Sequence, residues 1–194
     1  MAINDEALDV IFRAARTHNR WQDKPVSPAL LMAIYDLMRW GPTTDNSTPL
    51  RIVYVVSQAA KEKLKPHLDA SNVKKTMAAP ATAILGYDLD FARHMGRLYP
   101  RDPEAPNWFT DPEKAKTAAF RNAGIQGGYF IVAARALGLD CGPMSGFDNA
   151  GVDRAFFAGT AVKSNFLCNL GYGDPSGVRP RGPRLSFDEA CRIV

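Results

Sequence analysis

Cysteine and histidine are scarce in this 194-residue sequence, which contains three of each. Cys141, Cys168 and Cys191 form no Cys-x-x-Cys pair, and the histidines lie far apart along the chain. Because zinc sites need clustered cysteine and histidine ligands, we expect no metal site. The scarcity also argues against a disulfide-bonded secreted scaffold and favours a reducing, cytoplasmic compartment.

Long hydrophobic runs are also missing. No apolar segment approaches the length that spans a bilayer, and the N-terminal sequence MAINDEALDV lacks the apolar core of a signal peptide. The net charge of +4 is too small to indicate nucleic-acid binding, and the basic clusters lack interleaved aromatic residues. We therefore expect a protein that binds neither membranes nor nucleic acid.

Several catalytic motifs are absent as well. The sequence has no GxGxxG after its first predicted strand, no P-loop, no GxSxG elbow and no HExxH. These absences exclude a Rossmann dinucleotide site and disfavour a serine hydrolase or a zinc protease. If the chain is an enzyme, a bound organic cofactor must supply the difficult chemistry.

What the sequence does contain is typical of one globular domain. Apolar residues make up 46% and charged residues 23%, so we expect a single domain over residues 1–194. Hydrophobic periodicity predicts helices over 4–15, 28–38, 113–137 and 152–157, a helix that Ser57 caps and another that begins at Ser186. Strands are predicted over 51–56, 81–87 and 164–172. Because helices outweigh strands without regular βαβ alternation, the predicted fold class is α+β.

Three segments invite closer interpretation. The helix over 113–137 carries one stripe, formed by Ala119, Ala123, Gln126, Phe130 and Ala133. Its glycines, Gly124, Gly127 and Gly128, lower helix propensity but permit close approach by another backbone or a flat ligand. Residues 90–112 are rich in proline and predict an irregular loop, in which Trp108 and Phe109 favour a functional flap. The sequence GPMSGF over 142–147 predicts a turn.

Four polar clusters are candidates for ligand binding. Arginine forks and a hydroxyl over 16–20, and arginines over 179–184, suit a phosphate because a guanidinium binds two oxygens at once. The small polar loop over 42–46 suits the edge of a heterocycle, and backbone N–H groups over 142–147 suit a ligand beside them. Taken singly, each cluster also fits a solvated turn, an ordinary loop or a basic tail.

Taken in order, the clusters resemble the FMN-dependent nitroreductase family over about residues 7–194. The resemblance rests on ARTHNRWQDKPVS (15–27), WGPTTDN (40–46), RNAGIQGGY (121–129), ALGLDCGPMSGFD (136–148), FFAG (156–159), KSNFLCNLGYGD (163–174) and PRLSFDEA (183–190). Within the family, the sequence is most similar to the malonic semialdehyde reductases of pyrimidine degradation, also described as 3-hydroxypropionate dehydrogenases. The resemblance implies a central mixed or antiparallel sheet flanked by helices, in an intertwined homodimer with two FMN sites at its interface.

The resemblance also implies roles for particular residues. The N-terminal phosphate-binding segment falls on Arg16, Thr17, His18 and Arg20, and the C-terminal phosphate arginines fall on Arg181 and Arg184. The flavin-contacting loop falls on Pro42, Thr43, Thr44 and Asn46. The turn that faces flavin N5 falls on Pro143, Met144, Ser145 and Gly146, where the backbone at Ser145 and Gly146 has the role nearest to catalysis.

The implied activity is hydride transfer from NADH or NADPH through FMN to a small aldehyde. Malonic semialdehyde, which would be reduced to 3-hydroxypropionate, is the expected substrate. Two alternatives remain open: a broad nitroreductase or enone reductase, and a flavin-binding protein without turnover. No side chain is assigned as a proton donor.

Overall fold

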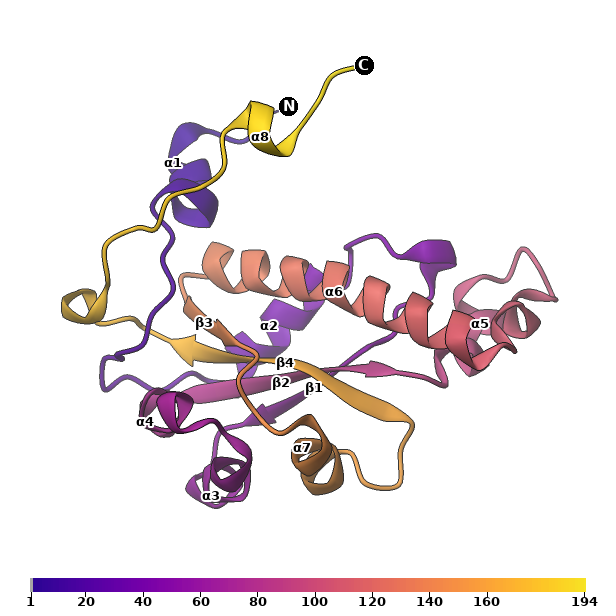
Figure 1. Ribbon diagram of the computed structural model, residues 1–194, viewed down its shortest axis with the longest axis horizontal. Coiled ribbons are helices and arrows are strands. Elements are labelled where there is room, and N and C mark those ends of the chain that lie inside the picture. Colours follow the sequence, from indigo (N-terminus) through magenta and orange to yellow (C-terminus); the bar gives the residue numbers. More distant parts are fainter. Residues whose placement is uncertain (1) are drawn as a thin grey trace.

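The computed structural model describes residues 2–194, so the first residue of the predicted 1–194 domain lies outside the described part (Figure 1). Its centre is a four-stranded sheet in the order β1-β2-β4-β3, with every neighbouring pair antiparallel. The strands are β1 (Leu50–Val55), β2 (Ala81–Asp88), β3 (Asp140–Met144) and β4 (Val162–Gly171). The continuous apolar run that predicted a buried strand forms β2, where only Tyr87 is incompletely buried.

Helices cover both faces of the sheet. On one face lie α2 (Pro28–Met38) and α6 (Pro112–Ala136), and on the other lie α3 (Gln58–Leu64), α4 (Ala70–Ala78) and α7 (Asn149–Phe156) (Figure 1). The side chains of Ser27 and Ser57 cap α2 and α3, as the sequence predicts. Short helical turns link these elements: η2 (Thr44–Asn46), η3 (Lys65–His67) and η6 (Pro175–Gly177).

The long helix α6 has one buried and one open face. The predicted stripe is buried, and Gly127 is required there because a Cβ would lie 2.7 Å from the Phe166 ring. Gly124 and Gly128 face the other way, where a Cβ would meet nothing within 4 Å. Gly138, with φ of 78°, ends the helical segment as predicted.

Two local predictions are wrong. The GPMSGF segment does not begin as a turn, because residues 142–144 belong to the edge strand β3. An edge strand tolerates Pro143, since one side of its backbone needs no partner strand. Residues 90–112 are not irregular either: they form η4 (Phe91–His94), α5 (Met95–Leu98) and η5 (Ala105–Phe109) around a small core that they share with the first half of α6. The rings of Trp108 and Phe109 pack against Tyr99 and Phe91, with centroids 5.3 and 4.8 Å apart.

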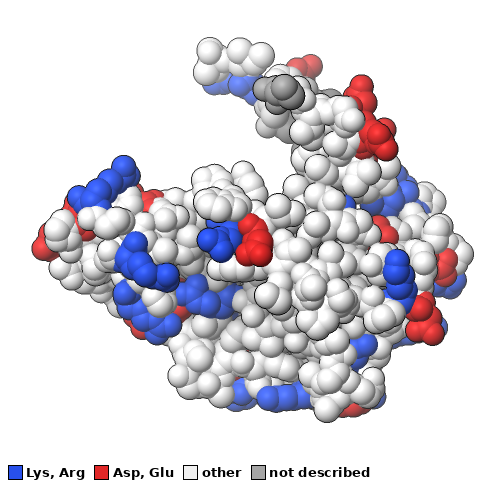
Figure 2. Space-filling view, turned by 180° about the vertical axis from the view of Figure 1, so that it is seen from behind, with Lys and Arg blue, Asp and Glu red and all other residues white. Residues whose placement is uncertain are grey.

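The two ends of the chain run together away from the body (Figures 1 and 2). Helix α1 (Asp5–Leu8) continues as the π-helical η1 (Asp9–Arg13), so the predicted first helix is only partly α-helical. Helix α8 (Phe187–Ala190) begins with the predicted capping box of Ser186 and Glu189. Every residue of the C-terminal arm, residues 179–194, is exposed, including the large apolar Leu185 and Phe187. Across residues 2–194, no helix is long and apolar enough to cross a membrane.

Candidate functional site

A cavity of about 470 Å³ lies where the N-terminal segment, the last turn of α6 and the C-terminal arm meet. We call it the arginine cavity, because five arginines line it and no acidic residue does: Arg16, Arg135, Arg179, Arg181 and Arg184. Thr17 also lines it. Four of the predicted phosphate residues, Arg16, Thr17, Arg181 and Arg184, are therefore brought together from opposite ends of the sequence.

Four of the five arginines of this cavity are held by backbone carbonyls, which are neutral. Arg16 donates to the carbonyl of Arg179, and Arg181 donates to the carbonyls of Arg13 and Ala15 at 2.7 and 3.1 Å. Arg135 donates to the carbonyl of Ile11 at 3.1 Å, while its buried Nε has no partner in the described residues. Since none of the five forms an ion pair within residues 2–194, their positive charge is uncompensated. Such a cavity favours a multiply charged anion.

Two predicted phosphate residues lie outside this cavity. The His18 ring is buried, with Nδ1 3.3 Å from a carboxylate oxygen of Asp140, and it packs over Gly173. The aliphatic part of Arg20 covers Gly177, so neither side chain lines the arginine cavity. For these two residues, contact with the phosphate stays a prediction that the arginine cavity does not support. The backbone of His18 joins the N-terminal segment to β3, since its N–H donates to the carbonyl of Cys141 at 3.0 Å.

Strand β3 leads from the arginine cavity to the predicted N5-facing backbone. Thr17 pairs with Cys141 at the start of β3, and Ser145 follows the end of the strand. Four residues of extended chain separate Cys141 from Ser145, a distance of about 14 Å. The amide N–H groups of Ser145 and Gly146 donate to no acceptor within the described chain, so they are free for a ligand.

The segment after β3 is anchored from α4. The Gly146 carbonyl accepts from the Asn72 side-chain amide at 2.7 Å and from the Asp69 N–H at 3.1 Å. Pro143 is half-buried, and the Met144 side chain packs into the core between the sheet and α3, α4 and α7. Ser145 is exposed, so its side chain is free for a ligand, whereas those of Pro143 and Met144 are not. Sequence reasoning missed Asn72, because a single asparagine within a helix gives no motif.

Lys75, also on α4, belongs to the same electrostatic environment. Burial lowers the pKa of Lys75, and the positive charge of Arg179 lowers it further. The charge of an arginine that lines the cavity therefore acts on Lys75, although Lys75 is remote in sequence from every predicted phosphate residue. Arg135 was likewise missed as a member of the cavity, because it is isolated among apolar residues in the sequence. Arg179 belongs to the basic cluster over 179–184, although the family resemblance gave it no role.

The predicted flavin-contacting loop lies elsewhere. Its Thr44 N–H donates to the Asn122 side-chain oxygen at 2.8 Å, in the first half of α6, and Asn46 donates to the carbonyl of Leu98 at 2.9 Å. Thr43 accepts from the N–H of Thr48 at 3.2 Å, and Pro42 is exposed. Thirteen residues of α6 separate Asn122 from Arg135, which is about 20 Å along the helix axis. One chain therefore does not bring this loop to its own arginine cavity.

Backbone strain is concentrated in the same loop. Among the described non-glycine residues, positive φ occurs only at Asp45, Asn46 and Thr48, with φ of 49°, 54° and 39°. Thr48 is β-branched, for which such a φ is unusual and costs about 1–3 kcal/mol. Strain of this kind is typical of segments whose conformation serves ligand binding.

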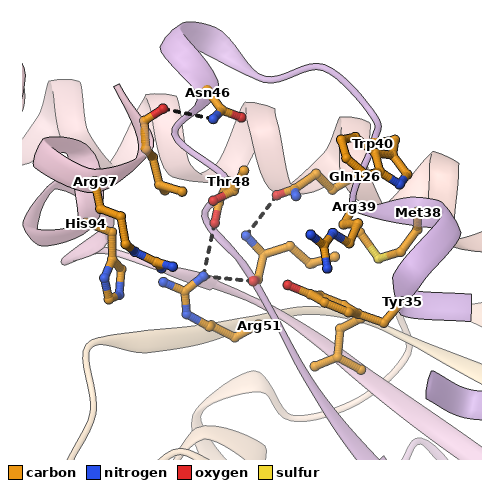
Figure 3. Close-up of a pocket in the computed structure, with 13 residues that line it drawn as sticks. Tyr35, Met38, Arg39, Trp40, Asn46, Thr48, Arg51, His94, Arg97 and Gln126 are labelled. Carbon is orange, nitrogen blue, oxygen red and sulfur yellow. Dashed lines mark hydrogen bonds between the residues drawn. The ribbon is translucent and has the colours of Figure 1, made fainter. Parts of the chain in front are cut away.

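A second cavity, of about 580 Å³, adjoins the strained loop (Figure 3). We call it the loop cavity; Asn46 and Thr48 line it, together with residues from α2, β1, α5 and α6. Arg39, Arg51 and Arg97 line it, and no acidic side chain does. Sequence reasoning gave these three arginines no role, because they are scattered along the chain. No group of three or more candidate metal ligands occurs in residues 2–194.

The comparisons with known proteins agree with this geometry. The model of the nitroreductase family matches residues 12–172. A relative from Stenotrophomonas maltophilia, provisionally named an NADH dehydrogenase/NAD(P)H nitroreductase, is 59% identical over 194 residues and covers 100% of this chain and 98% of its own. A provisionally named nitroreductase of Exiguobacterium sibiricum, solved in complex with FMN, has a TM-score of 0.87 at 16% identity, covering 100% of this chain and 99% of that one. An enone reductase of gut-bacterial fatty acid saturation has a TM-score of 0.84 at 14% identity and covers 100% of both chains. These structural likenesses confirm the predicted α+β fold.

Proposed function

Because the chain belongs to the nitroreductase family, we propose that it is an FMN-dependent NAD(P)H oxidoreductase whose arginine cavity binds the flavin phosphate. The observation that carries this proposal is the set of five arginines without an acidic partner in the described chain. A phosphate dianion is the ligand that such a set favours, since charge-assisted hydrogen bonds contribute about 1.5–3 kcal/mol each. The FMN in the Exiguobacterium structure supports the same cofactor.

The residues present fit the cofactor. Arg16, Thr17, Arg181 and Arg184 would hold the phosphate, with Arg135 adding its unpartnered Nε. The free N–H groups of Ser145 and Gly146 would donate to the ring at N5, and Asn72 fixes this backbone through the Gly146 carbonyl. FMN, when bound, supplies the hydride transfer between NAD(P)H and the substrate. The protein contributes binding, orientation and hydrogen-bond donors.

The complete site would need two copies of the chain. The predicted flavin residues form two groups about 20 Å apart along α6, one at the arginine cavity and one at the loop. A twofold dimer with its α6 helices antiparallel would bring the loop of one copy to the arginine cavity of the other. The open face of α6 supports this arrangement, since Phe120, Ile125 and Tyr129 are 54%, 42% and 43% exposed beside two glycines. The exposed C-terminal arm would then extend over the partner.

For the physiological reaction, we propose reduction of malonic semialdehyde to 3-hydroxypropionate. The aldehyde carbon gains a hydride and its oxygen gains a proton, while NAD(P)H is oxidised to NAD(P)⁺. The support is the sequence resemblance over 136–148 and 163–174. The names of the Stenotrophomonas relative and of the enone reductase favour a second candidate, a broad NAD(P)H nitroreductase or enone reductase.

Spectroscopy of the purified protein tests the proposal. We expect flavin absorption bands that bleach on anaerobic addition of NADH or NADPH and return on addition of malonic semialdehyde. Return only with nitroaromatics, quinones or enones would select the second candidate. A flavin that NAD(P)H does not reduce would indicate a binding protein without turnover, and a colourless protein that does not take up FMN would contradict the cofactor.

A further inference from the structure

We propose that the loop cavity binds the carboxylate of the substrate, and that Arg97 is the residue that selects for this group. The inference rests on the proposed function, because the strained loop at the rim of this cavity would face the flavin of the partner copy. It deepens that function by assigning the substrate class as small carbonyl compounds that carry an anionic group.

The cavity is cationic, and its arginines approach from different elements. Arg39 and Tyr35 extend from α2, Arg51 from β1, and Arg97 from α5, as Figure 3 shows. The polar ends of Arg97 and Arg51 point toward each other, with Thr48 and Asn46 of the strained loop above them (Figure 3). Lysine and arginine are also frequent on the surface at the α5 end of the molecule (Figure 2).

Most of these arginines already have acidic partners. Arg51 pairs with Asp88 at 2.7 Å, and the same carboxylate, which is fully buried, accepts from Arg93 at 3.3 Å. Arg93 also pairs with Asp90 at 3.0 Å, and Arg39 lies 3.7 Å from Asp36. The three arginines that line the cavity and the neighbouring Arg93 carry four positive charges, and the three aspartates carry three negative charges. The net charge of about +1 around the cavity is what a single carboxylate would balance.

Arg97 provides that charge. It makes no ion pair and no side-chain hydrogen bond within residues 2–194, although its neighbour Arg93 makes several. Its guanidinium is therefore free to bind both oxygens of a carboxylate. His94 is not a competing cation at neutral pH, because burial and the nearby Arg51 and Arg93 lower its pKa.

The rest of the lining suits a small carbonyl compound. The Gln126 side-chain oxygen accepts from the Leu50 N–H at 3.0 Å, which fixes its orientation, and the apolar Met38, Trp40 and Leu98 line the remainder. The cavity therefore combines a cation for one end of a short ligand with apolar surface for the other.

Binding and turnover in the Arg97→Gln variant test the inference. Malonate is the probe for binding, because it carries carboxylates on the same three-carbon skeleton as malonic semialdehyde. Calorimetric titration of the flavin-loaded protein should show malonate binding that weakens by about 10- to 100-fold in the variant. In steady-state kinetics, the variant should lose at least about tenfold of the preference for malonic semialdehyde over the neutral propanal, mainly through KM.

Arg101→Gln is the matched control, since Arg101 is exposed, stacks over Tyr99 and does not line the loop cavity. Equal loss of malonate binding in both variants would overturn the assignment to Arg97. Unchanged malonate binding together with a changed ratio of NADPH-dependent to NADH-dependent activity would also overturn it, because Arg97 would then bind the extra phosphate of NADPH. A protein that takes up FMN, reduces quinones and ignores malonate would overturn the inference while leaving the oxidoreductase intact. A protein that binds malonate but no flavin would overturn only the proposed function.

Discussion

The two cavities have similar linings but differ in how their positive charge is balanced. The arginine cavity has five arginines, four of them held by backbone carbonyls, with no ion pair in the described chain. The loop cavity has three arginines, of which Arg51 and Arg39 already face aspartates. The charge left over, rather than the number of arginines, indicates the ligand: a phosphate dianion in the first cavity and a single carboxylate in the second.

Their positions are as informative as their charges. The loop cavity meets α6 at Gln126 and the arginine cavity meets it at Arg135, about 14 Å farther along the helix, although the proposed reaction needs both at one flavin. In the proposed arrangement, a twofold pair with antiparallel α6 helices, and not a single copy, brings both to one flavin.

The largest effect should come from separating the two copies. Gly124→Glu places a charge on the open face of α6, where a Cβ meets nothing within 4 Å, so the fold of one copy is unaffected. We expect a monomer in sedimentation at micromolar concentration that retains no FMN. Gly124→Ala is the control and should remain a yellow dimer, because alanine favours helix. A monomeric Gly124→Glu variant that keeps its flavin would break the link between assembly and site.

A smaller effect is expected at the arginine cavity itself. Arg16→Ala removes one guanidinium from the phosphate site and should weaken FMN binding by roughly 10- to 100-fold. Flavin titration of the apoprotein measures this change. Arg20→Ala should bind FMN normally, since Arg20 covers Gly177 outside the cavity. Equal losses in the two variants would show that net charge alone, and not the cavity, holds the flavin.

The backbone beside β3 should respond more moderately. Asn72→Ala removes the 2.7 Å hydrogen bond to the Gly146 carbonyl and should cost about 0.5–1.5 kcal/mol, or roughly 1–6 °C in Tm. We also expect slower flavin reduction in stopped-flow measurements, because the free N–H groups of Ser145 and Gly146 lose their support. Reduction at the wild-type rate would show that this backbone does not serve the flavin. Gly146→Val is a poorer probe, because its Cβ would lie 2.5 Å from the Asp69 carboxylate and disturb folding.

The smallest expected effect is a pH dependence of stability that comes from His94, which lines the loop cavity. The pKa of His94 is lowered in the folded protein, first by burial and then by Arg51 and Arg93, with Arg97 and the opposing Asp88 contributing less. The unfolded chain therefore binds the proton more readily, and stability should fall as pH decreases below about 6.5. Thermal melts at pH 7.5 and 5.5 should show a smaller decrease for His94→Gln than for the wild type. An identical decrease in both proteins would show that His94 is not the group responsible.

The sequence was enough to predict the periodic helices and strands, but only some of the residues that line the two cavities. The buried stripe of α6 and the apolar run of β2 are regular enough to identify their structures. Strand β3 was missed because Gly142 and Pro143 signal a turn, and only pairing with β4 makes them a strand. The burial of His18 against Asp140 is a tertiary contact without a local signal. Arg39, Arg51 and Arg97 come together only when α2, β1 and α5 do.

A heterodimer of two defective chains tests the shared site most directly. One chain would carry Arg16→Ala and Arg181→Ala in the arginine cavity. The other would carry Pro42→Trp in the loop, where Pro42 is exposed and tolerates the larger ring within its own copy. Co-expression with two different tags allows purification of the mixed dimer, and absorbance gives its flavin content. If each site combines the arginine cavity of one copy with the loop of the other, one site of the pair is intact, and the heterodimer should bind about one FMN where either homodimer binds almost none. A heterodimer as empty as the two homodimers would contradict the shared site.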